Sequence, residues 1–456
     1  MRSRPITKEN TPMSKITHDN RITIILGAGA VFEATKVSTY SLTKDVLKAC
    51  SDIPINEDDK TSLVELICRA YNKLYESDSR LLHSKGKHWD TKALSIISFE
   101  DIFHAIEMLD GFKSKGAAYG FNPVYKIFAS EKRKFKKAEM LSVYLSASRL
   151  IQTLNDKVHE YDVEFSKKGG YFKHFFEELH KDGYKFDVYN LNYDTWVEQT
   201  LDGIGCGYND GFVNLSKFGL NGYDDKFQRF DSEYYWNNEK SLDTVAHLHG
   251  QIKFEYPDFK RDDINYFSYR DSNAELYKYR DYEVASDYRK RSSRSTGTTQ
   301  GGVSLFRTNI ITGLEKTEKL LWTPMDLYHM ALGRSLLENK RLIIIGYGFP
   351  DKYLNSLLTT YIDAHFKDGR VVVADKIKED GDPWSSGSDL TPFTQNDKTL
   401  FLHRMFNDQL WYARTHWDTK YIVDGYWNKD KSRVLFGKGF RYVSEEKMDE
   451  VVGVMG

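Results

Sequence analysis

The chain has 456 residues, and its 65 lysines and arginines almost cancel its 66 aspartates and glutamates. This length supports about two or three domains with a buried core. A formal net charge of -1 excludes a general electrostatic attraction to nucleic acids or anionic membranes, so we expect neither as a direct partner.

Three cysteines occur, Cys50, Cys68 and Cys206, and no two of them form a C-x-x-C pair. This spacing excludes a cysteine-built zinc site and a disulfide framework, and it indicates a reducing compartment. Residues 1–20 are polar without the apolar core of a signal peptide, and no run of about 18 apolar residues follows. We therefore expect a cytoplasmic protein without zinc.

The first predicted strand ends in a glycine turn. Residues 21–35 read RITIILGAGAVFEAT, so an apolar run stops at Gly27, Ala28, Gly29 and Ala30. Such a turn at the start of a helix can hold a pyrophosphate on its backbone N–H groups. The dehydrogenase fingerprint G-x-G-x-x-G is incomplete, because Phe32 stands at its third glycine. An ordinary strand-to-helix turn explains the pattern equally well.

Helical periodicity dominates the next stretch of the chain. We predict a helical insertion over about residues 51–183, within an α/β domain. The helices predicted in and beside it are Leu42–Cys50, Asp59–Tyr75, Phe99–Leu109, Ala138–Glu160 and Tyr171–His180.

A second strand is predicted at residues 185–194, KFDVYNLNYD. Its polar end puts Asn192 and Asp194 at the edge of an α/β sheet where ligands bind. Alternatively, Asp194 caps the following helix and Asn192 shapes the turn.

Two histidines, His247 and His249, stand in the segment HLHG at residues 247–250. On one strand face they could bind a metal together, but no third ligand follows at a suitable spacing. A histidine before glycine is either a packed strand-end residue or a general base near neutral pH.

The last predicted elements of the domain alternate as in a parallel sheet with crossover helices: a helix at 326–338, a strand at 341–348, a helix at 352–365 and a strand at 370–375. Gly346 and Gly348 make a tight turn, and Asp351 caps the next helix. The small residues of this turn also let the backbone approach a ribose or phosphate.

The domain layout follows from these segments. We predict an N-terminal segment at 1–20, an α/β domain at 21–376 with a flexible loop at about 286–303, and a small C-terminal extension at 377–456. The loop is predicted because residues 291–302, RSSRSTGTTQGG, cannot pack a core.

Four motifs occur in a specific order: GAGA, NYD, LHG and IIGYGFPD. Together they resemble the SIR2 (sirtuin-like) superfamily, most closely the bacterial SIR2-like proteins of anti-phage defence. The segment SFEDIFHAIEML at 98–109 is similar to a helical segment of those defence proteins. The resemblance runs from about Ile22 to Asp375, and it implies a doubly wound, Rossmann-like parallel sheet.

The resemblance also implies the site residues. Asn192 would contact the nicotinamide-side ribose of NAD+ and position a water molecule, and His249 would act as the base. The turn from Gly27 to Ala30 would hold the pyrophosphate. The riboses and the adenine would be surrounded by Asp194, Gly346, Gly348, Asp351 and Asp375.

Two departures separate the chain from the protein deacetylases of this superfamily. It lacks their four-cysteine zinc module, and VFEATKVSTYSLTKDV replaces their Pro-Asp-Phe-Arg segment. The resemblance therefore implies an NAD+ glycohydrolase that releases nicotinamide and ADP-ribose and depletes NAD+ during phage infection. It also implies a homo-oligomer or a complex with a partner such as a HerA-type ATPase. The alternatives are an NAD-dependent deacylase or ADP-ribosyltransferase, and a non-catalytic sensor of NAD or ADP-ribose.

Overall fold

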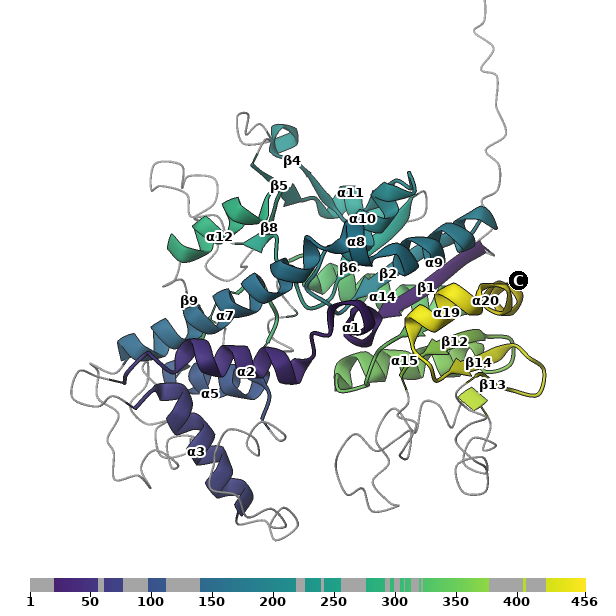
Figure 1. The fold of residues 1–456 in the computed structure, drawn as a ribbon. Helices are drawn as coiled ribbons and strands as arrows, with labels where there is room; N and C mark the ends of the chain where they lie inside the picture. Colours follow the sequence, from purple (N-terminus) through teal and green to yellow (C-terminus); the bar gives the residue numbers. More distant parts are fainter. Residues whose placement is uncertain are drawn as a thin grey trace, which may run out of the picture.

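The central element of the fold is a mostly parallel sheet that carries helices on both faces and a helical lobe at one end (Figure 1). The computed structural model of the chain describes residues 20–55, 61–76, 97–111, 140–218, 226–238, 242–255, 276–291, 296–298, 304–306, 308–312, 320, 323–376, 405–406 and 424–456. The predicted segment 1–20 lies outside the described residues except for its last residue.

The central sheet has eight strands in the order β13-β14-β12-β11-β1-β2-β6-β3. All neighbours are parallel except β13 and β14. The prediction of a doubly wound, Rossmann-like parallel sheet is therefore confirmed. The strands are β1 (Arg21–Leu26), β2 (Lys185–Asn190), β3 (Tyr208–Asn209), β6 (Asp243–His247), β11 (Arg341–Ile345), β12 (Arg370–Ala374), β13 (Tyr426–Trp427) and β14 (Arg433–Phe436).

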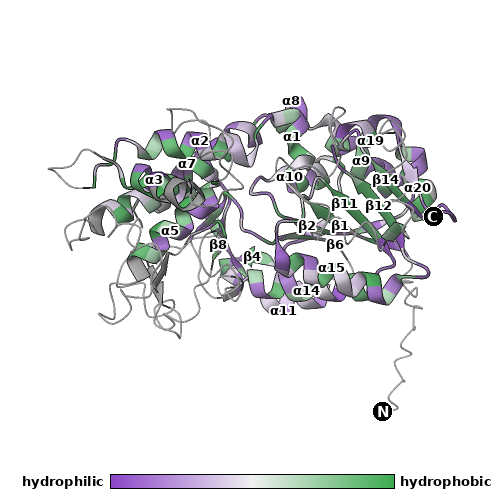
Figure 2. Cartoon of the chain, turned by 90° about the horizontal axis from the view of Figure 1, so that it is seen from below, coloured by the Kyte–Doolittle hydropathy of each residue, from purple (hydrophilic) through white to green (hydrophobic). Residues whose placement is uncertain are grey.

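The inner strands read as continuous apolar runs because both faces of the sheet are covered. Ile24 packs into the core on one face, and Ile25 packs into the core on the other. Figure 2 shows the two helical layers on either side of the apolar strands. One layer contains α1 (Gly29–Thr35), α9 (Gly170–Lys181), α10 (Trp196–Gly203), α19 (Phe440–Glu446) and α20 (Met448–Met455), and the other contains α14 (Met325–Glu338) and α15 (Lys352–His365).

The helical lobe lies beyond the end of α1 (Figure 1). It contains α2 (Thr39–Cys50), α3 (Leu63–Glu76), α5 (Phe99–Gly111) and α7 (Met140–Asp162), and the short α8 (Phe165–Lys168) follows. Ser38 starts α2 through a capping box with Ser41. The lobe thus begins before residue 51, and α9, which the predicted insertion included, belongs to the layer on the sheet.

A second, antiparallel sheet joins β4 (Phe212–Asn214), β5 (Phe227–Phe230), β8 (Tyr277–Tyr279) and β7 (Phe254–Glu255) in that order. Beside it lie η6 (Leu215–Phe218), α11 (Ser232–Asn238) and α12 (Tyr282–Arg291), and β9 (Thr296–Thr298) pairs with β10 (Ser304–Phe306).

The predicted flexible loop at 286–303 is wrong for its first residues, which continue α12. This helix is anchored on α7, because the Tyr282 ring stacks on His159 and Gln152 donates a hydrogen bond to Ser286. Residues 296–298 form β9, and the other residues of the predicted loop lie outside the described part of the chain.

The boundary predicted at residue 376 is also wrong. The described part of the supposed C-terminal extension adds β14 to the sheet beside β12, and α19 packs on α9. Val434, Leu435 and Phe436 are almost completely buried, so this segment completes the main core.

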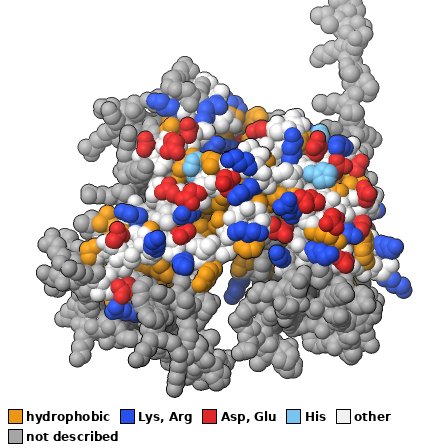
Figure 3. Space-filling model, in the orientation of Figure 1, with side chains coloured by type: hydrophobic (Ala, Val, Ile, Leu, Met, Phe, Trp, Pro, Cys, Tyr) orange, Lys and Arg blue, Asp and Glu red, His pale blue; other side chains and the backbone are white. Residues whose placement is uncertain are grey.

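Within the described residues, no helix is long and apolar enough to cross a membrane. On the face drawn in Figure 3, acidic and basic side chains are interspersed over the described surface.

Candidate functional site

The sheet has its topological switch point at β1. From β1 the chain adds β2 and β6 on one side, and later β11, β12 and β14 on the other. Loops that leave the carboxyl ends of strands in opposite directions open a crevice, which is the usual ligand site of such sheets. A cavity of about 1560 Å³ lies at this edge.

Most of the predicted site residues line this cavity. It is lined by Gly27, Ala28, Gly29, Asn192, His249, Gly346, Gly348, Asp351 and Asp375, together with residues from the helical lobe and from the C-terminal segment. Each of these nine predicted residues follows the carboxyl end of a parallel strand, so residues far apart in sequence meet at one edge of the sheet.

The two glycine turns pack directly on each other. Gly29 donates its N–H to the Gly346 carbonyl at 2.9 Å, and a Cβ on Gly27 would lie 2.5 Å from that oxygen. Gly346 has φ +59, and a Cβ there would lie 2.3 Å from the backbone nitrogen of Ala30. The glycines are therefore required by backbone packing, whatever the turn binds.

The first turn still offers hydrogen-bond donors to a ligand. Among the described residues, no protein acceptor bonds the N–H groups of Ala28 and Val31, and both residues line the cavity. N–H groups at a helix start are suited to phosphate oxygens.

Hydrogen bonds hold Asn192 against the first glycine turn. Its N–H donates to Asn190 Oδ1 at 2.9 Å, and its side-chain Nδ2 donates to the Gly27 carbonyl at 3.1 Å. With Nδ2 engaged, Oδ1 is the atom through which this amide can accept a hydrogen bond from a hydroxyl group or water. Asn192 thus acts both as a turn residue and as part of the cavity wall.

His249 is paired with Asp351 on the opposite wall of the cavity. The His249 Nε2 and Asp351 Oδ2 atoms are 2.9 Å apart, and both side chains are more than nine-tenths buried. The other oxygen of Asp351 accepts the N–H groups of Tyr353 and Leu354 at the start of α15. The predicted helix cap is therefore confirmed.

The carboxylate of Asp351 also orients the imidazole, as in other histidine–carboxylate pairs. The turn that holds His249 is fixed on its far side, because the His249 carbonyl accepts the N–H of Ile311 at 2.8 Å.

Two predicted site residues, Ala30 and Asp194, do not line the cavity. Ala30 is buried inside α1, and its carbonyl accepts the Tyr171 hydroxyl. Asp194 is buried as well, and it accepts the N–H of Trp196 and the Tyr161 hydroxyl. Its side chain turns back onto the start of α10, as the alternative expected, but the residue at the cap position is Thr195.

The carboxyl group of Asp194 is not an ordinary acid. Burial, followed by the nearby Asp162 carboxylate, raises its pKa to about 7. The group is thus part of the packing behind the cavity wall.

Asp375 follows β12 and lines the cavity. Its Oδ1 accepts the N–H of Lys376 at 2.8 Å, and its carbonyl accepts the N–H of Gly439. Together with Lys438, which follows β14, it forms the far wall of the cavity.

The helical lobe also contributes residues to the cavity wall, which the sequence did not predict. Ser98 and Glu100 at the start of α5 line the cavity, as do Tyr161 and Tyr193. Burial, followed by the Glu100 charge, raises the pKa of Tyr193 well above its usual value. The signals were present in SFEDIF and NYD, but their place in the wall depends on how the lobe packs over the sheet.

His247 belongs to a buried cluster, here called the Glu198 network, which consists of Asp210, Glu198, His247, Gln251 and Lys278. His247 Nε2 lies 3.0 Å from Glu198 Oε1, and Lys278 Nζ lies 3.4 Å from the same oxygen. Lys278 also pairs with Asp210 at 2.5 Å.

The charged groups of the Glu198 network shift one another's pKa values. Burial alone would lower the pKa of His247, but the Glu198 carboxylate outweighs burial and raises it. Burial would raise the pKa of Glu198, but His247 and Lys278 hold it well below its usual range. His247 is thus a packed strand-end residue, and of the two histidines only His249 lines the cavity.

Residues 187–380 match the family model of the SIR2-like domain. This match supports the SIR2-like superfamily. Members of this family use NAD+, and the matched range includes Asn192, His249 and Asp351. No curated protein matches the chain significantly.

The SIR2-like match begins after β1 and ends before β14, although both strands belong to the same sheet. The Gly27 turn and Lys438 therefore complete the cavity of the SIR2-like domain from outside the matched range. The three cysteines of the chain are too few for a four-cysteine zinc module, and all of them are buried free thiols.

Proposed function

We propose that this protein is an NAD+ glycohydrolase, which hydrolyses NAD+ to nicotinamide and ADP-ribose. The observation that carries the proposal is that Asn192 and His249 line one cavity beside the packed glycine turns. An amide that orients a hydroxyl group or water and a histidine that accepts a proton are the groups this hydrolysis needs.

The cavity has room for a dinucleotide. Its volume of about 1560 Å³ exceeds the roughly 300–1,000 Å³ of typical small-molecule sites. The pyrophosphate would lie on the N–H groups of Ala28 and Val31, and the adenosine ribose would lie near Asp375. The nicotinamide end would then reach Asn192 and His249.

The chemistry requires no strong acid. As the bond from ribose C1′ to the nicotinamide nitrogen breaks, its electron pair stays on that nitrogen, and the cationic ring leaves neutral. The ribose develops oxocarbenium character, as in glycoside hydrolysis. Asn192 orients the water whose oxygen bonds to C1′, and His249 takes the proton that this water loses. The charge that forms on the imidazole is stabilised by Asp351.

Water is the favoured acceptor because the chain lacks the four-cysteine module that helps deacetylases form a peptide groove. The wider role in our proposal is NAD+ depletion in the cytoplasm during anti-phage defence, with activity controlled in a homo-oligomer or by a partner such as a HerA-type ATPase. This wider role rests on the resemblance to defence proteins.

The direct test incubates the purified chain with NAD+, alone and with its candidate partner, and measures nicotinamide and ADP-ribose by chromatography. We expect equal amounts of the two products, and we expect Asn192→Ala to abolish both. Asn214→Ala is the matched control, because this amide lies on the exposed surface of β4.

Other outcomes contradict the proposal in distinct ways. Tight binding of NAD+ without turnover in either condition would indicate a sensor. Nicotinamide release only with an acyl-lysine peptide or a protein acceptor would indicate a deacylase or transferase. The defence role fails separately if cellular NAD+ stays constant during infection of cells that express the chain with its partner.

A further inference from the structure

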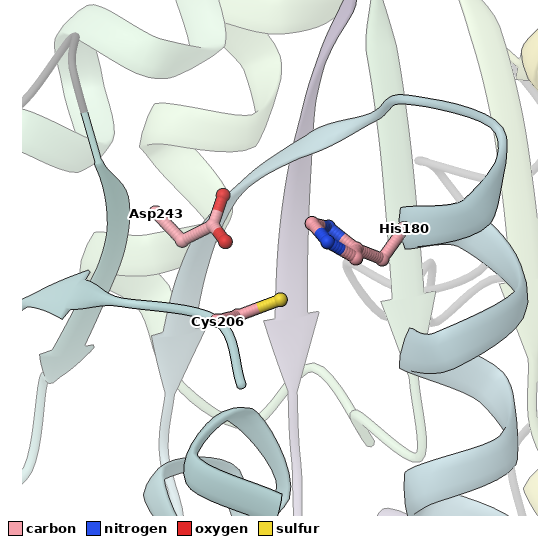
Figure 4. Close-up of side chains that lie close together, drawn as sticks. All are labelled: His180, Cys206 and Asp243. Carbon is pink, nitrogen blue, oxygen red and sulfur yellow. The ribbon is translucent and has the colours of Figure 1, made fainter. Parts of the chain in front are cut away.

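Three side chains of metal-ligand type meet at the amino edge of the central sheet. His180 lies in the last turn of α9, Cys206 lies between α10 and β3, and Asp243 is the first residue of β6. One ligand atom from each lies within 4.8 Å of the others, and Figure 4 shows the three groups pointing toward one another. The cluster is separated from the cavity by the length of β6, about 16 Å for five residues.

Two of these three side chains have a buried polar atom without a hydrogen-bond partner among the described residues. Asp243 is fully buried, and its Oδ1 accepts the N–H of Phe186 at 2.9 Å. Within the described part of the chain, its Oδ2 is buried without a hydrogen-bond partner, and His180 Nδ1 is in the same state. A buried carboxylate oxygen without a partner is costly and calls for an explanation such as a bound ion.

The local charges are compatible with a cation. Burial raises the pKa of Asp243, and burial followed by the Asp243 charge raises the pKa of the Cys206 thiol, while Lys185 lowers both. Arg21, the other nearby positive charge, is held in an ion pair with Asp187. One carboxylate and one thiolate would neutralise a divalent ion, and His180 would bind it as the neutral imidazole.

We propose that His180, Cys206 and Asp243 bind a zinc ion. Zinc accepts this mixture of nitrogen, sulfur and oxygen ligands, and three protein ligands leave a fourth position for water. Zinc bonds of about 2.0–2.3 Å place tetrahedral ligand atoms roughly 3.5 Å apart. The three ligand atoms here lie within 4.8 Å of one another, so zinc binding has to bring them closer together, and His180 is the partly exposed member of the three. The Cys206 thiol loses its proton to solvent as the sulfur–zinc bond forms.

The ion adds a direct link between three segments of the chain. It connects the end of α9 and the loop before β3 to the start of β6, beneath the strand that leads to His249. The role is therefore structural and separate from NAD+ cleavage, so the two proposals fail independently.

Cobalt substitution tests the site directly. The full-length chain is stripped with a chelator and titrated with Co²⁺, because a thiolate ligand gives a charge-transfer absorption band. We expect one Co²⁺ per chain, displaced by one Zn²⁺, and loss of the band in Cys206→Ser. Cys68→Ser is the matched control, since Cys68 is also a buried free thiol but lies in the lobe. No band in the wild type, or an equal band in Cys206→Ser, would overturn the proposal.

A second variant avoids the risk of misfolding. His180→Ala changes a partly exposed side chain, and His174→Ala removes another histidine from the same helix. We expect His180→Ala to lower zinc affinity at least 100-fold while His174→Ala leaves it unchanged. Zinc should also raise the melting temperature of the wild type and of His174→Ala, but not of His180→Ala. Equal zinc binding by the two histidine variants would contradict the site.

Discussion

His247 and His249 are two residues apart, yet they lie in different regions of the molecule. His247 ends β6 and is bonded to Glu198 inside the Glu198 network, whereas His249 follows in the turn and is bonded to Asp351 at the cavity. The separation comes from the end of the strand, because side chains two positions apart share a face only while the chain stays extended. Gly250, with φ +89, then closes the turn that carries His249.

The two regions use a histidine–carboxylate pair for different purposes. In the Glu198 network Glu198, His247 and Gln251 are buried, so the pair contributes to the stability of the fold. At the cavity the pair can reach a ligand, so its contribution concerns the reaction. A substitution in one region should leave the property of the other unchanged.

The largest expected effect is on activity at the cavity. His249→Ala removes the proposed base and should slow NAD+ cleavage by about 10²–10⁴-fold, equivalent to roughly 3–5 kcal/mol in the barrier. The free energy of unfolding should fall by less than in the Glu198 network, because Asp351 keeps its hydrogen bonds to the start of α15. Steady-state nicotinamide release and chemical denaturation measure the two quantities, and a variant that remains fully active would contradict the assignment.

The Glu198 network should give the opposite result. Glu198→Gln leaves the buried His247 without its counter-charge, while Lys278 keeps Asp210, and breaking a buried pair costs about 3–5 kcal/mol. Denaturant titration should show this loss of stability, while the folded fraction keeps its rate of NAD+ cleavage. Unchanged stability would mean that the network does not support the fold.

Asp351→Asn should separate the two functions of Asp351. The amide oxygen still caps α15, but the negative charge beside His249 is lost. We expect cleavage to slow by about tenfold, or about 1.4 kcal/mol, with stability unchanged. Asp351→Ala should in addition lose about 1 kcal/mol of stability through the missing cap. Equal activity of the wild type and Asp351→Asn would show that Asp351 acts only as a cap.

The smallest expected effect is on the pH dependence of stability. The pKa of His247 is raised in the folded protein because the Glu198 carboxylate outweighs burial, while in the unfolded chain it is near 6.5. The pair therefore contributes fully below about pH 6.5, and its contribution is lost as pH rises through the raised pKa. The stability difference between the wild type and Glu198→Gln should shrink over that range. A constant difference from pH 6 to pH 9 would contradict this.

The sequence predicted the parallel sheet well because most of its strands are short segments rich in apolar residues that end in a turn. It also predicted correctly that Asn192, His249 and Gly346 lie at one edge, since each follows such a strand. Asp194, two positions beyond Asn192, was also expected at this edge. It does not line the cavity, because its side chain turns back onto the next helix.

The remaining errors involve contacts between distant segments. Nothing local in RVLF indicates that it pairs with β12, so the C-terminal boundary was wrong. His180, Cys206 and Asp243 form no spacing motif, and they meet only because α9, the loop before β3 and β6 share one edge of the sheet.

The place of β14 in the sheet has a consequence for the synthesis of the protein. The far wall of the cavity contains Gly437, Lys438 and Tyr442, which are translated after every other part of the site. A nascent chain on the ribosome therefore has no finished cavity until these residues have left the exit tunnel. Truncated translation products that stop before β14 lack both this wall and the core strand beside β12. We therefore expect incomplete chains to be inactive in the proposed reaction.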